Sequence, residues 1–144
     1  MTRSRYASNL TLLSFAMNRK TIATENAPAA IGPYSQAVEV NGTVYVSGQI
    51  PLDPETGEIV DGGISPQTIR VLENLKAVVE ATGGTMADVS KVTIYIVDMK
   101  QFATVNQIYG SYFPAPFPAR TCVEVSTLPK GVEVEMDAIA HRND

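Results

Sequence analysis

The sequence predicts an α+β fold in which about six strands form a sheet and two helices cover one of its faces. Short segments rich in β-branched residues recur along the chain, and two amphipathic segments are long enough to be helices. They follow one another as strands, helix, strand, helix and strands, and two helices can cover only one face of such a sheet. The length of 144 residues and the hydrophobic content of 44% suit a single domain with a buried core.

The first part of this domain predicts a strand, a loop and a hairpin. A short strand is expected near residues 19–23, and the loop ENAPAAIGPY follows because its prolines and glycine disfavour regular structure. SQAVEV and TVYVSG are predicted to be strands joined at Asn41-Gly42, since this dipeptide readily adopts the positive φ angles of a tight hairpin turn.

Two helices separated by a strand are expected next. The first helix is predicted to begin with Ser65 as its cap and Pro66 in its first turn, and to end at Gly83-Gly84. Its predicted apolar side comprises Ile69, Leu72, Leu75 and Val79. VSKVTIYIVD is typical of a strand, and Asp98 can cap the second helix. That helix is expected to carry Phe102, Val105 and Tyr109 and to run towards Phe113.

The segment PARTCVEVSTLPKGVEVEMDAIA predicts a two-stranded hairpin. If its strands turn around Thr127 and Leu128, Arg120 lies opposite Glu135, and opposite side chains share a face. The predicted polar face carries Arg120, Cys122, Glu124, Glu133, Glu135 and Asp137. The predicted core face carries Val123, Val125, Val132, Val134 and Met136. A slip of one residue would bring charges into the core, so the pattern specifies the register.

Arg120 and Glu135 are the main candidates for a functional site. An arginine can hold a ligand carboxylate through two parallel hydrogen bonds, and a nearby glutamate can orient or deprotonate a water molecule. This pair predicts a site that hydrolyses a small acid. The alternative is a solvated polar face with one incidental ion pair, worth about 0.2–1 kcal/mol.

The sheet face without helices predicts self-association. It is expected to show Tyr45, Ser47, Thr93, Tyr95 and Val97 beside the charged residues of the hairpin. Such a face is too apolar for water and too charged for a closed core, so burial against another copy of the chain is expected. Arg120 and Glu135 would then lie at or near a subunit boundary.

The composition limits the cellular compartments and the kinds of partner that are expected for this protein. A single cysteine fits a reducing compartment, and no apolar run approaches the roughly 18 residues that span a bilayer, so a cytoplasmic protein with no membrane partner is expected. Residues 1–19 are predicted to be an extension outside the domain, which comprises residues 20–144. They are rich in Arg, Ser and Thr, and no acidic residue precedes Glu25. This is typical of an organelle-targeting peptide, but a flexible extension, an ordered extra segment or a start at Met17 fits as well.

Five segments together resemble a known family. NAPAAIGPYSQAV, VSGQIP, ENLKAVVEATG, FATVNQIY and PARTCVEVSTLPKGVEVEMDAIA occur in this order between about Lys20 and Ala140. In these segments the chain closely resembles the RidA/YjgF family of reactive-intermediate deaminases. The resemblance implies a chorismate-mutase-like α+β fold, with a six-stranded mixed sheet and two helices on one face. It also implies a homotrimer with clefts between its subunits.

The resemblance further implies imine hydrolysis without a cofactor. Catalytic members convert 2-iminobutanoate and 2-iminopropanoate, or their enamine tautomers, to 2-oxo acids and ammonia. These substrates are reactive intermediates that pyridoxal-phosphate-dependent dehydratases form from threonine and serine. The arginine of the P-A-R-[ST]-C-V-E-V stretch marks the catalytic members and is Arg120 here, while Glu135 matches the glutamate that positions the attacking water. The matching substrate-binding positions are Arg120, Cys122, Tyr34, Ser47, Gly48 and Asn106.

Other chemistries fit the sequence less well. A cysteine nucleophile needs an imidazole base, and the only histidine, His141, lies near the end of the chain, so Cys122 is expected to be a partly buried cleft residue. A metal site is not expected, because His and Cys ligands are too few. The net charge of −4 argues against nucleic acid as a partner, and therefore against a ribonuclease or translation inhibitor. A non-catalytic trimer that senses small carboxylic acids stays an alternative; it would need Arg120 but not Glu135.

Overall fold

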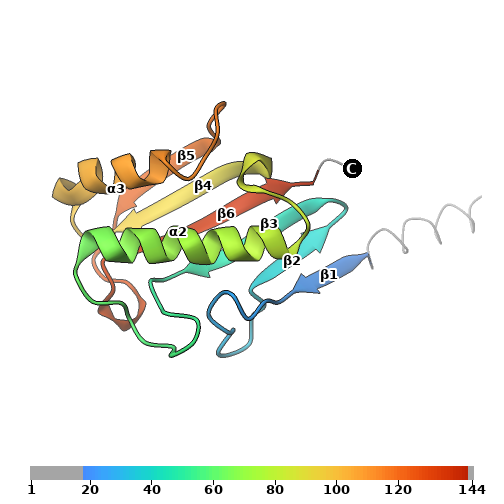
Figure 1. The fold of residues 1–144 in the computed structure, drawn as a ribbon, viewed down its shortest axis with the longest axis horizontal. Coiled ribbons are helices and arrows are strands. Elements are labelled where there is room, and N and C mark those ends of the chain that lie inside the picture. The colour runs from blue at the N-terminus through green and yellow to red at the C-terminus, as the bar shows by residue number, and fades with distance from the viewer. Residues whose placement is uncertain (1–17, 143–144) are drawn as a thin grey trace, which may run out of the picture.

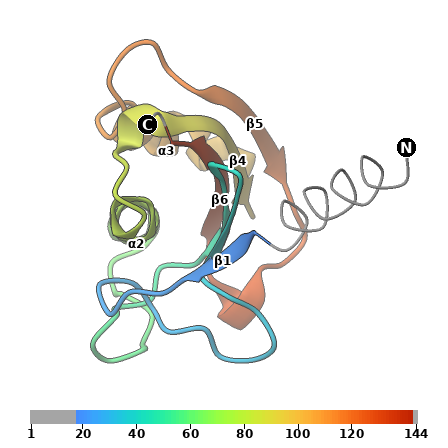
Figure 2. The ribbon, with the colours of Figure 1, turned by 90° about the vertical axis from the view of Figure 1, so that its right-hand side faces the viewer.

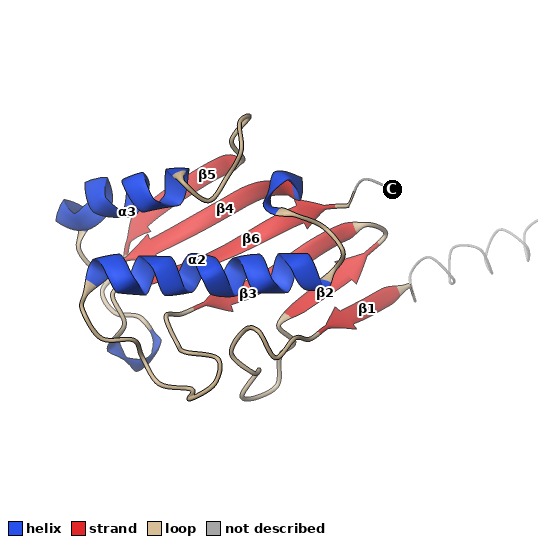
Figure 3. Cartoon of the chain, viewed as in Figure 1, coloured by secondary structure: helices blue, strands red, loops and turns tan. Residues whose placement is uncertain are grey.

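A computed structural model describes residues 18–142 as one six-stranded sheet with two helices on one face (Figure 1; Figure 3). The strands are β1 (Arg19–Ile22), β2 (Ala37–Val40), β3 (Thr43–Gln49), β4 (Val89–Ile96), β5 (Ala119–Glu124) and β6 (Val134–His141). The helices are α2 (Ile64–Ala81) and α3 (Phe102–Gly110), with 3-10 turns at Met86–Asp88, Met99–Gln101 and Pro129–Gly131. The predicted α+β sheet is confirmed. The expectations for residues 1–17 lie outside the described residues, and the sheet begins at Arg19.

The strand order in the sheet is β1-β2-β3-β6-β4-β5. β4 and β5 are parallel, and all other neighbours are antiparallel. Parallel strands cannot be joined by a tight turn and need a crossover, which α3 provides between β4 and β5. α2 likewise connects β3 to β4, which run in the same direction on either side of β6. Both crossovers lie on the same side of the curved sheet (Figure 2).

The predicted hairpin between the last two strands is wrong. β5 and β6 do not pair, because β4 lies between them: Arg120 is the neighbour of Val92, and Glu135 is the neighbour of Tyr95. The physical reason is the crossover through α3, which brings β5 to the outer edge of β4 and leaves the inner edge for β6. β4 thereby gains a partner on both edges, which a central strand needs because its buried backbone N–H and C=O groups must be hydrogen-bonded.

The turn predicted from Asn41-Gly42 is confirmed. It joins β2 to β3 with φ angles of 50° and 85°. Asp98 also caps as expected, since its Oδ1 accepts a hydrogen bond from the Lys100 N–H at 3.0 Å in the 3-10 turn that leads into α3. The predicted cap of α2 is wrong by two residues. Gly63, at φ 82°, stands at the N-cap, and Ser65 lies inside the first turn.

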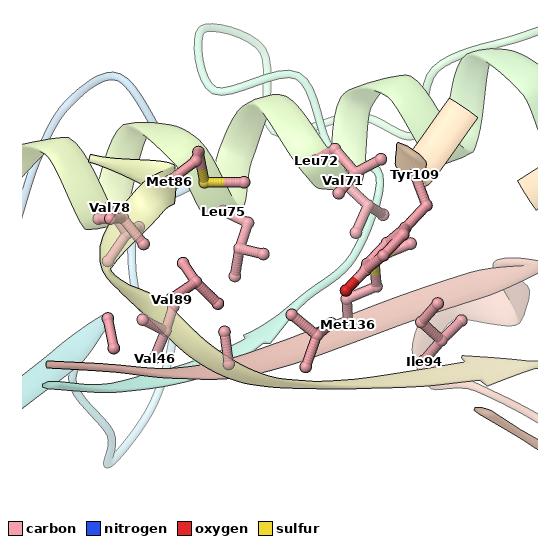
Figure 4. Close-up of a cluster of buried hydrophobic side chains, with 14 of the residues drawn as sticks. Val46, Val71, Leu72, Leu75, Val78, Met86, Val89, Ile94, Tyr109 and Met136 are labelled. Atoms are coloured by element: carbon pink, nitrogen blue, oxygen red, sulfur yellow. The ribbon is translucent and has the colours of Figure 1, made fainter. Parts of the chain in front are cut away.

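The core lies between the two helices and the sheet (Figure 4). Leu72, Leu75 and Val79 of α2 are buried as predicted, but Ile69 is 45% exposed. Thr68 takes the inward position instead, because its hydroxyl donates to the Ile64 carbonyl at 2.7 Å and is therefore satisfied without water. None of the helices in residues 18–142 has the length and hydropathy needed to cross a membrane.

Two substitutions in α2 test this packing. Leu75→Ala is expected to lower the free energy of unfolding by about 2–5 kcal/mol, because it leaves a cavity in the core. Ile69→Ala removes a comparable side chain from the same helix and should change it by less than about 1 kcal/mol, since Ile69 is exposed. Urea unfolding at one fixed protein concentration measures both values. Equal losses would show that the helix is rotated from the orientation described.

Candidate active site

Arg120 lies at the β5 edge of the sheet, on the side that carries the helices. Its Nη1 donates a hydrogen bond to Asn106 Oδ1 at 2.6 Å. Its guanidinium carbon lies 5.3 Å from the centre of the Phe102 ring and 5.0 Å from the centre of the Tyr109 ring. The guanidinium lines a cleft of about 450 Å³ formed by Asn106, Tyr109, Gly110, Phe117, Pro118 and Arg120. The cleft thus presents a cation against a mostly apolar wall.

Cys122 shares the helix side of the sheet with Arg120. It is partly buried and packs against the core, opposite Ile94 of β4. Burial raises the pKa of the Cys122 thiol, and the charge of Arg120 only partly opposes this effect. His141 stands on β6, next to Thr43 and on the far side of β4. Within one chain, His141 is therefore not placed to activate the Cys122 thiol as a nucleophile.

Glu135 lies on the opposite, uncovered face of the sheet. Its carboxylate is half-buried and occupies the space above Gly48, so a Cβ added at Gly48 would collide with Glu135 Oε2. The register of β3 against β6 shifts between Val46 and Gln49, which leaves Ser47 and Gly48 outside the regular pairing. The missing side chain at Gly48 is therefore what admits the carboxylate.

The surroundings of Glu135 raise the pKa of its carboxyl group. Burial, first, and the charge of Asp137, second, raise the pKa of Glu135 above its ordinary value of 4.5. Tyr95 donates a hydrogen bond to Asp137 Oδ2 at 3.0 Å, and burial together with this bond raises the pKa of Tyr95. A carboxyl group that holds its proton more tightly than usual is suited to exchange protons with a reacting group.

Ser47 and Tyr34 lie on the same uncovered face as Glu135. Ser47 Oγ donates to the Ser35 carbonyl at 2.5 Å, and its N–H donates to the Gln36 carbonyl at 3.0 Å, so β3 holds the loop that carries Tyr34. Tyr34 is 54% exposed. Its ring and Ser47 border a hollow of about 710 Å³ lined by Arg19, Gly32, Pro33, Tyr34, Ser35, Val38, Tyr45, Val46 and Ser47.

The predicted site residues therefore form two groups. The arginine group comprises Arg120, Asn106 and Cys122. The glutamate group comprises Glu135, Gly48, Ser47 and Tyr34. The expectation that Arg120 and Glu135 face each other within the chain is wrong, because β4 separates them and they point to opposite faces. No ion pair joins the two residues.

Sequence reasoning missed some neighbours of both groups. Phe102 and Tyr109 contact Arg120, although they were expected only as helix residues, and Asp137 influences Glu135. The spacing of FATVNQIY held the signal for the first two, since Phe102, Asn106 and Tyr109 recur at helical intervals. Within residues 18–142, no three His, Cys, Asp or Glu side chains come together as a metal site.

Comparison with known proteins identifies the family. A family model described as Endoribonuclease L-PSP matches residues 24–142. A relative from Salmonella typhimurium, named 2-iminobutanoate/2-iminopropanoate deaminase, is 53% identical over 126 residues, which cover 85% of this chain and 98% of that protein. The chain belongs to the RidA/YjgF family. The predicted family is thus confirmed.

Solved RidA/YjgF structures have the same fold. The YjgF gene product of E. coli matches with a TM-score of 0.82 and 49% identity, covering 86% of this chain and 99% of that one. E. coli TdcF with bound serine matches with a TM-score of 0.82 and 45% identity, over 86% of this chain and 99% of that one. The likeness covers most of this chain and nearly the whole of each solved structure.

Gly48→Ala tests the contact with Glu135. The added Cβ should displace the carboxylate or strain β3, so the free energy of unfolding should fall by an amount typical of overpacking, about 1–3 kcal/mol, and the thermal unfolding midpoint should fall with it. In a Glu135→Ala background the same change should be nearly neutral, because the obstacle is gone. Gly110→Ala is the matched control, since apart from its chain neighbours and the backbone of its own helix no atom lies within 4 Å of its added Cβ. A Gly48→Ala penalty that persists without the Glu135 carboxylate would contradict the contact.

The pKa of Glu135 predicts how stability depends on pH. An acid whose pKa is raised by folding stabilises the fold below its ordinary pKa, and this stabilisation is lost as the pH rises through the folded-state value. In the Glu135→Gln variant, the side chain at this position is uncharged at every pH. On going from about pH 4 to about pH 7, the unfolding midpoint of the wild type should therefore fall relative to that of the variant. If the unfolding midpoint of the wild type instead rises relative to that of the variant over this pH interval, a cation must compensate the Glu135 carboxylate in the assembled protein.

Proposed function

We propose that this protein hydrolyses 2-iminobutanoate and 2-iminopropanoate, or their enamine tautomers, to 2-oxo acids and ammonia. The predicted enzyme class is confirmed by relatives of that name at 48–53% identity, of whose length the match covers 90–98%. The observation that carries the proposal is Arg120, a cation held in a small cleft with an apolar wall. Such a cleft fits a short alkyl acid, and the serine bound to the related TdcF is a small acid of this kind.

The assembly proposed is a homotrimer in which each site joins two subunits. The arginine group and the glutamate group lie on opposite faces of one chain, so a single site that uses both needs two chains. A contact between different faces of neighbouring subunits can close into a ring, and the family resemblance supports a ring of three subunits. The uncovered face supports the proposal, since Tyr45 is 51% and Ile139 is 37% exposed on paired positions of β3 and β6.

Arg120 is proposed to bind the substrate carboxylate. Asn106 accepts a hydrogen bond from one N–H of Arg120 Nη1. The other N–H groups of the guanidinium can donate a pair of parallel hydrogen bonds to the carboxylate. Each charge-assisted bond contributes about 1.5–3 kcal/mol, enough to select an anion and fix its orientation. Cys122 borders the bound acid, largely through its backbone.

Glu135 of the neighbouring subunit is proposed to position the attacking water and to exchange protons with it. Water adds to the imine carbon to give a carbinolamine, and Glu135 accepts a proton from the water and delivers one to the nitrogen. The carbinolamine hydroxyl then gives its proton to Glu135, which passes it to the nitrogen; the C–N bond breaks, ammonia leaves and the C=O group of the 2-oxo acid forms. A carboxyl group with a raised pKa is suited to both transfers, and a well-placed general acid or base accelerates a reaction by about 10²–10⁴. Ser47, Gly48 and Tyr34 border this side of the site.

The alternative function is a sensor that binds small carboxylic acids without converting them. It shares Arg120 with the enzyme but gives no role to a half-buried carboxylate that a glycine is required to admit. Ribonuclease activity, which the description of the family model names, finds little support in a chain with a net charge of −4.

A coupled assay tests the activity. A pyridoxal-phosphate-dependent threonine dehydratase generates 2-iminobutanoate in the presence of semicarbazide, which traps the imine as a semicarbazone. The protein should lower the rate of semicarbazone formation and raise the yield of free 2-oxobutanoate, read by lactate dehydrogenase. Arg120→Ala is the matched control and should have no effect on either rate. An assembled wild-type protein that leaves both rates unchanged would exclude the enzyme and favour the sensor.

Subunit mixing tests the shared site. Arg120→Ala and Glu135→Gln should each be inactive alone, because every site then lacks one partner. Unfolding and refolding the two variants together at equal concentration should restore about one quarter of the wild-type activity, since that fraction of sites combines an intact Arg120 with an intact Glu135. Mixed oligomers that stay inactive would mean that both residues act from the same chain.

A further inference from the structure

Arg120 is held by an aromatic seat as well as by Asn106. Within residues 18–142, no carboxylate forms an ion pair with its guanidinium. Its contacts are the Asn106 hydrogen bond at 2.6 Å and the rings of Phe102 and Tyr109, whose centres lie 5.3 Å and 5.0 Å from its central carbon. Both distances lie within the range in which a cation is attracted to the face of a ring.

One stripe of α3 provides all three contacts. Phe102, Asn106 and Tyr109 follow one another at intervals of four and three residues, so they lie on the same side of the helix. That side faces the helix side of β5, where Arg120 stands. Three successive positions of one rigid element therefore restrain a single long side chain at the edge of the sheet.

The ring of Tyr109, rather than its hydroxyl, faces Arg120. Tyr109 is 3% exposed, and its hydroxyl is directed into the buried cluster of hydrophobic side chains, where it has no hydrogen-bond partner (Figure 4). The ring is in turn packed against Phe113, with centres 4.6 Å apart. Because the Tyr109 hydroxyl has no partner, Tyr109 interacts with Arg120 through the surface of its ring.

We propose that Phe102 and Tyr109 are positioning residues that hold the Arg120 guanidinium ready to bind the substrate carboxylate. The inference rests on the proposed function of Arg120 and deepens it. A free arginine side chain samples many rotamers, and fixing it on binding weakens affinity. The rings and Asn106 restrict it in advance, and they do so without a carboxylate that would neutralise the charge needed for the ligand.

Paired substitutions separate this role from simple packing. Phe102→Leu removes the ring and should raise KM for 2-iminobutanoate about 3- to 30-fold while kcat changes by less than about twofold. Phe102→Tyr restores a ring and should bring KM back towards the wild-type value. Tyr112→Leu is the matched control, because Tyr112 is another partly buried aromatic residue beside α3 that packs against the same core. It should leave KM unchanged.

Tyr109 gives a second, independent pair. Tyr109→Phe keeps the ring and removes the unsatisfied hydroxyl, so KM should stay close to the wild-type value and the unfolding midpoint should not fall. Tyr109→Leu should raise KM as Phe102→Leu does. If Tyr109→Leu does not fold, the Phe102 variants decide. Equal KM values for Phe102→Leu and Phe102→Tyr, or a fall in kcat at constant KM, would overturn the proposal.

Binding of the product 2-oxobutanoate distinguishes this inference from the proposed function. Titration calorimetry should show the dissociation constant rising by the same factor as KM in the variants that lack a ring. A wild type without deaminase activity that still binds 2-oxobutanoate in a ring-dependent way would refute the enzyme and retain the aromatic seat. An active wild type whose product affinity is unaffected by loss of the rings would refute the seat alone.

Discussion

The alternation of side chains along β4 determines where the functional groups of this protein lie. β4 is paired on both edges, and its Val92 and Ile94 must point into the core beneath the helices. Paired residues on adjacent strands point to the same face. Arg120, beside Val92, and Cys122, beside Ile94, therefore lie on the helix side. Glu135 pairs with Tyr95, which points the other way. One buried strand thus sets the direction of both chemical groups.

This separation keeps both charges available. Had β5 and β6 formed a hairpin, Arg120 and Glu135 would have neutralised each other in a pair worth about 0.2–1 kcal/mol, and neither would have been ready for a ligand. In the described chain, Arg120 is instead restrained by an amide and two rings, none of which cancels its charge. Glu135 lies beside another acid and half out of water, which raises its pKa and suits it to exchange protons with a ligand.

Space and hydrogen bonding decide the details around these groups. Gly48 admits the Glu135 carboxylate because it has no Cβ, a requirement that does not depend on backbone conformation. Thr68 can face the core because a helix carbonyl satisfies its hydroxyl. The Tyr109 hydroxyl, by contrast, is buried without a partner, while its ring supports Arg120. Thr68 and Tyr109 thus point inward for different reasons, one because its hydroxyl is hydrogen-bonded and the other because its ring supports Arg120. The contacts of each side chain in the folded structure show the reason.

The sequence by itself determined the local structure and the family. Asn41-Gly42 specified its turn through positive φ angles, the apolar period of α2 specified most of its buried side, and the long motifs around Arg120 and Glu135 identified the RidA/YjgF family. Such features depend on neighbours along the chain. The exceptions, Ile69 and the cap of α2, concern single positions that local preferences determine only weakly.

Only the tertiary structure decided which strands are neighbours. Strand periodicity tells which residues share a face within one strand, but it does not tell which strand lies alongside, and β5 and β6 are close in sequence yet separated by β4. The long-range pairing follows from the crossover through α3 and from the burial of β4, neither of which a local pattern contains. For this reason the sequence could single out Arg120 and Glu135 as candidates, while their placement on opposite faces emerged only from the folded chain.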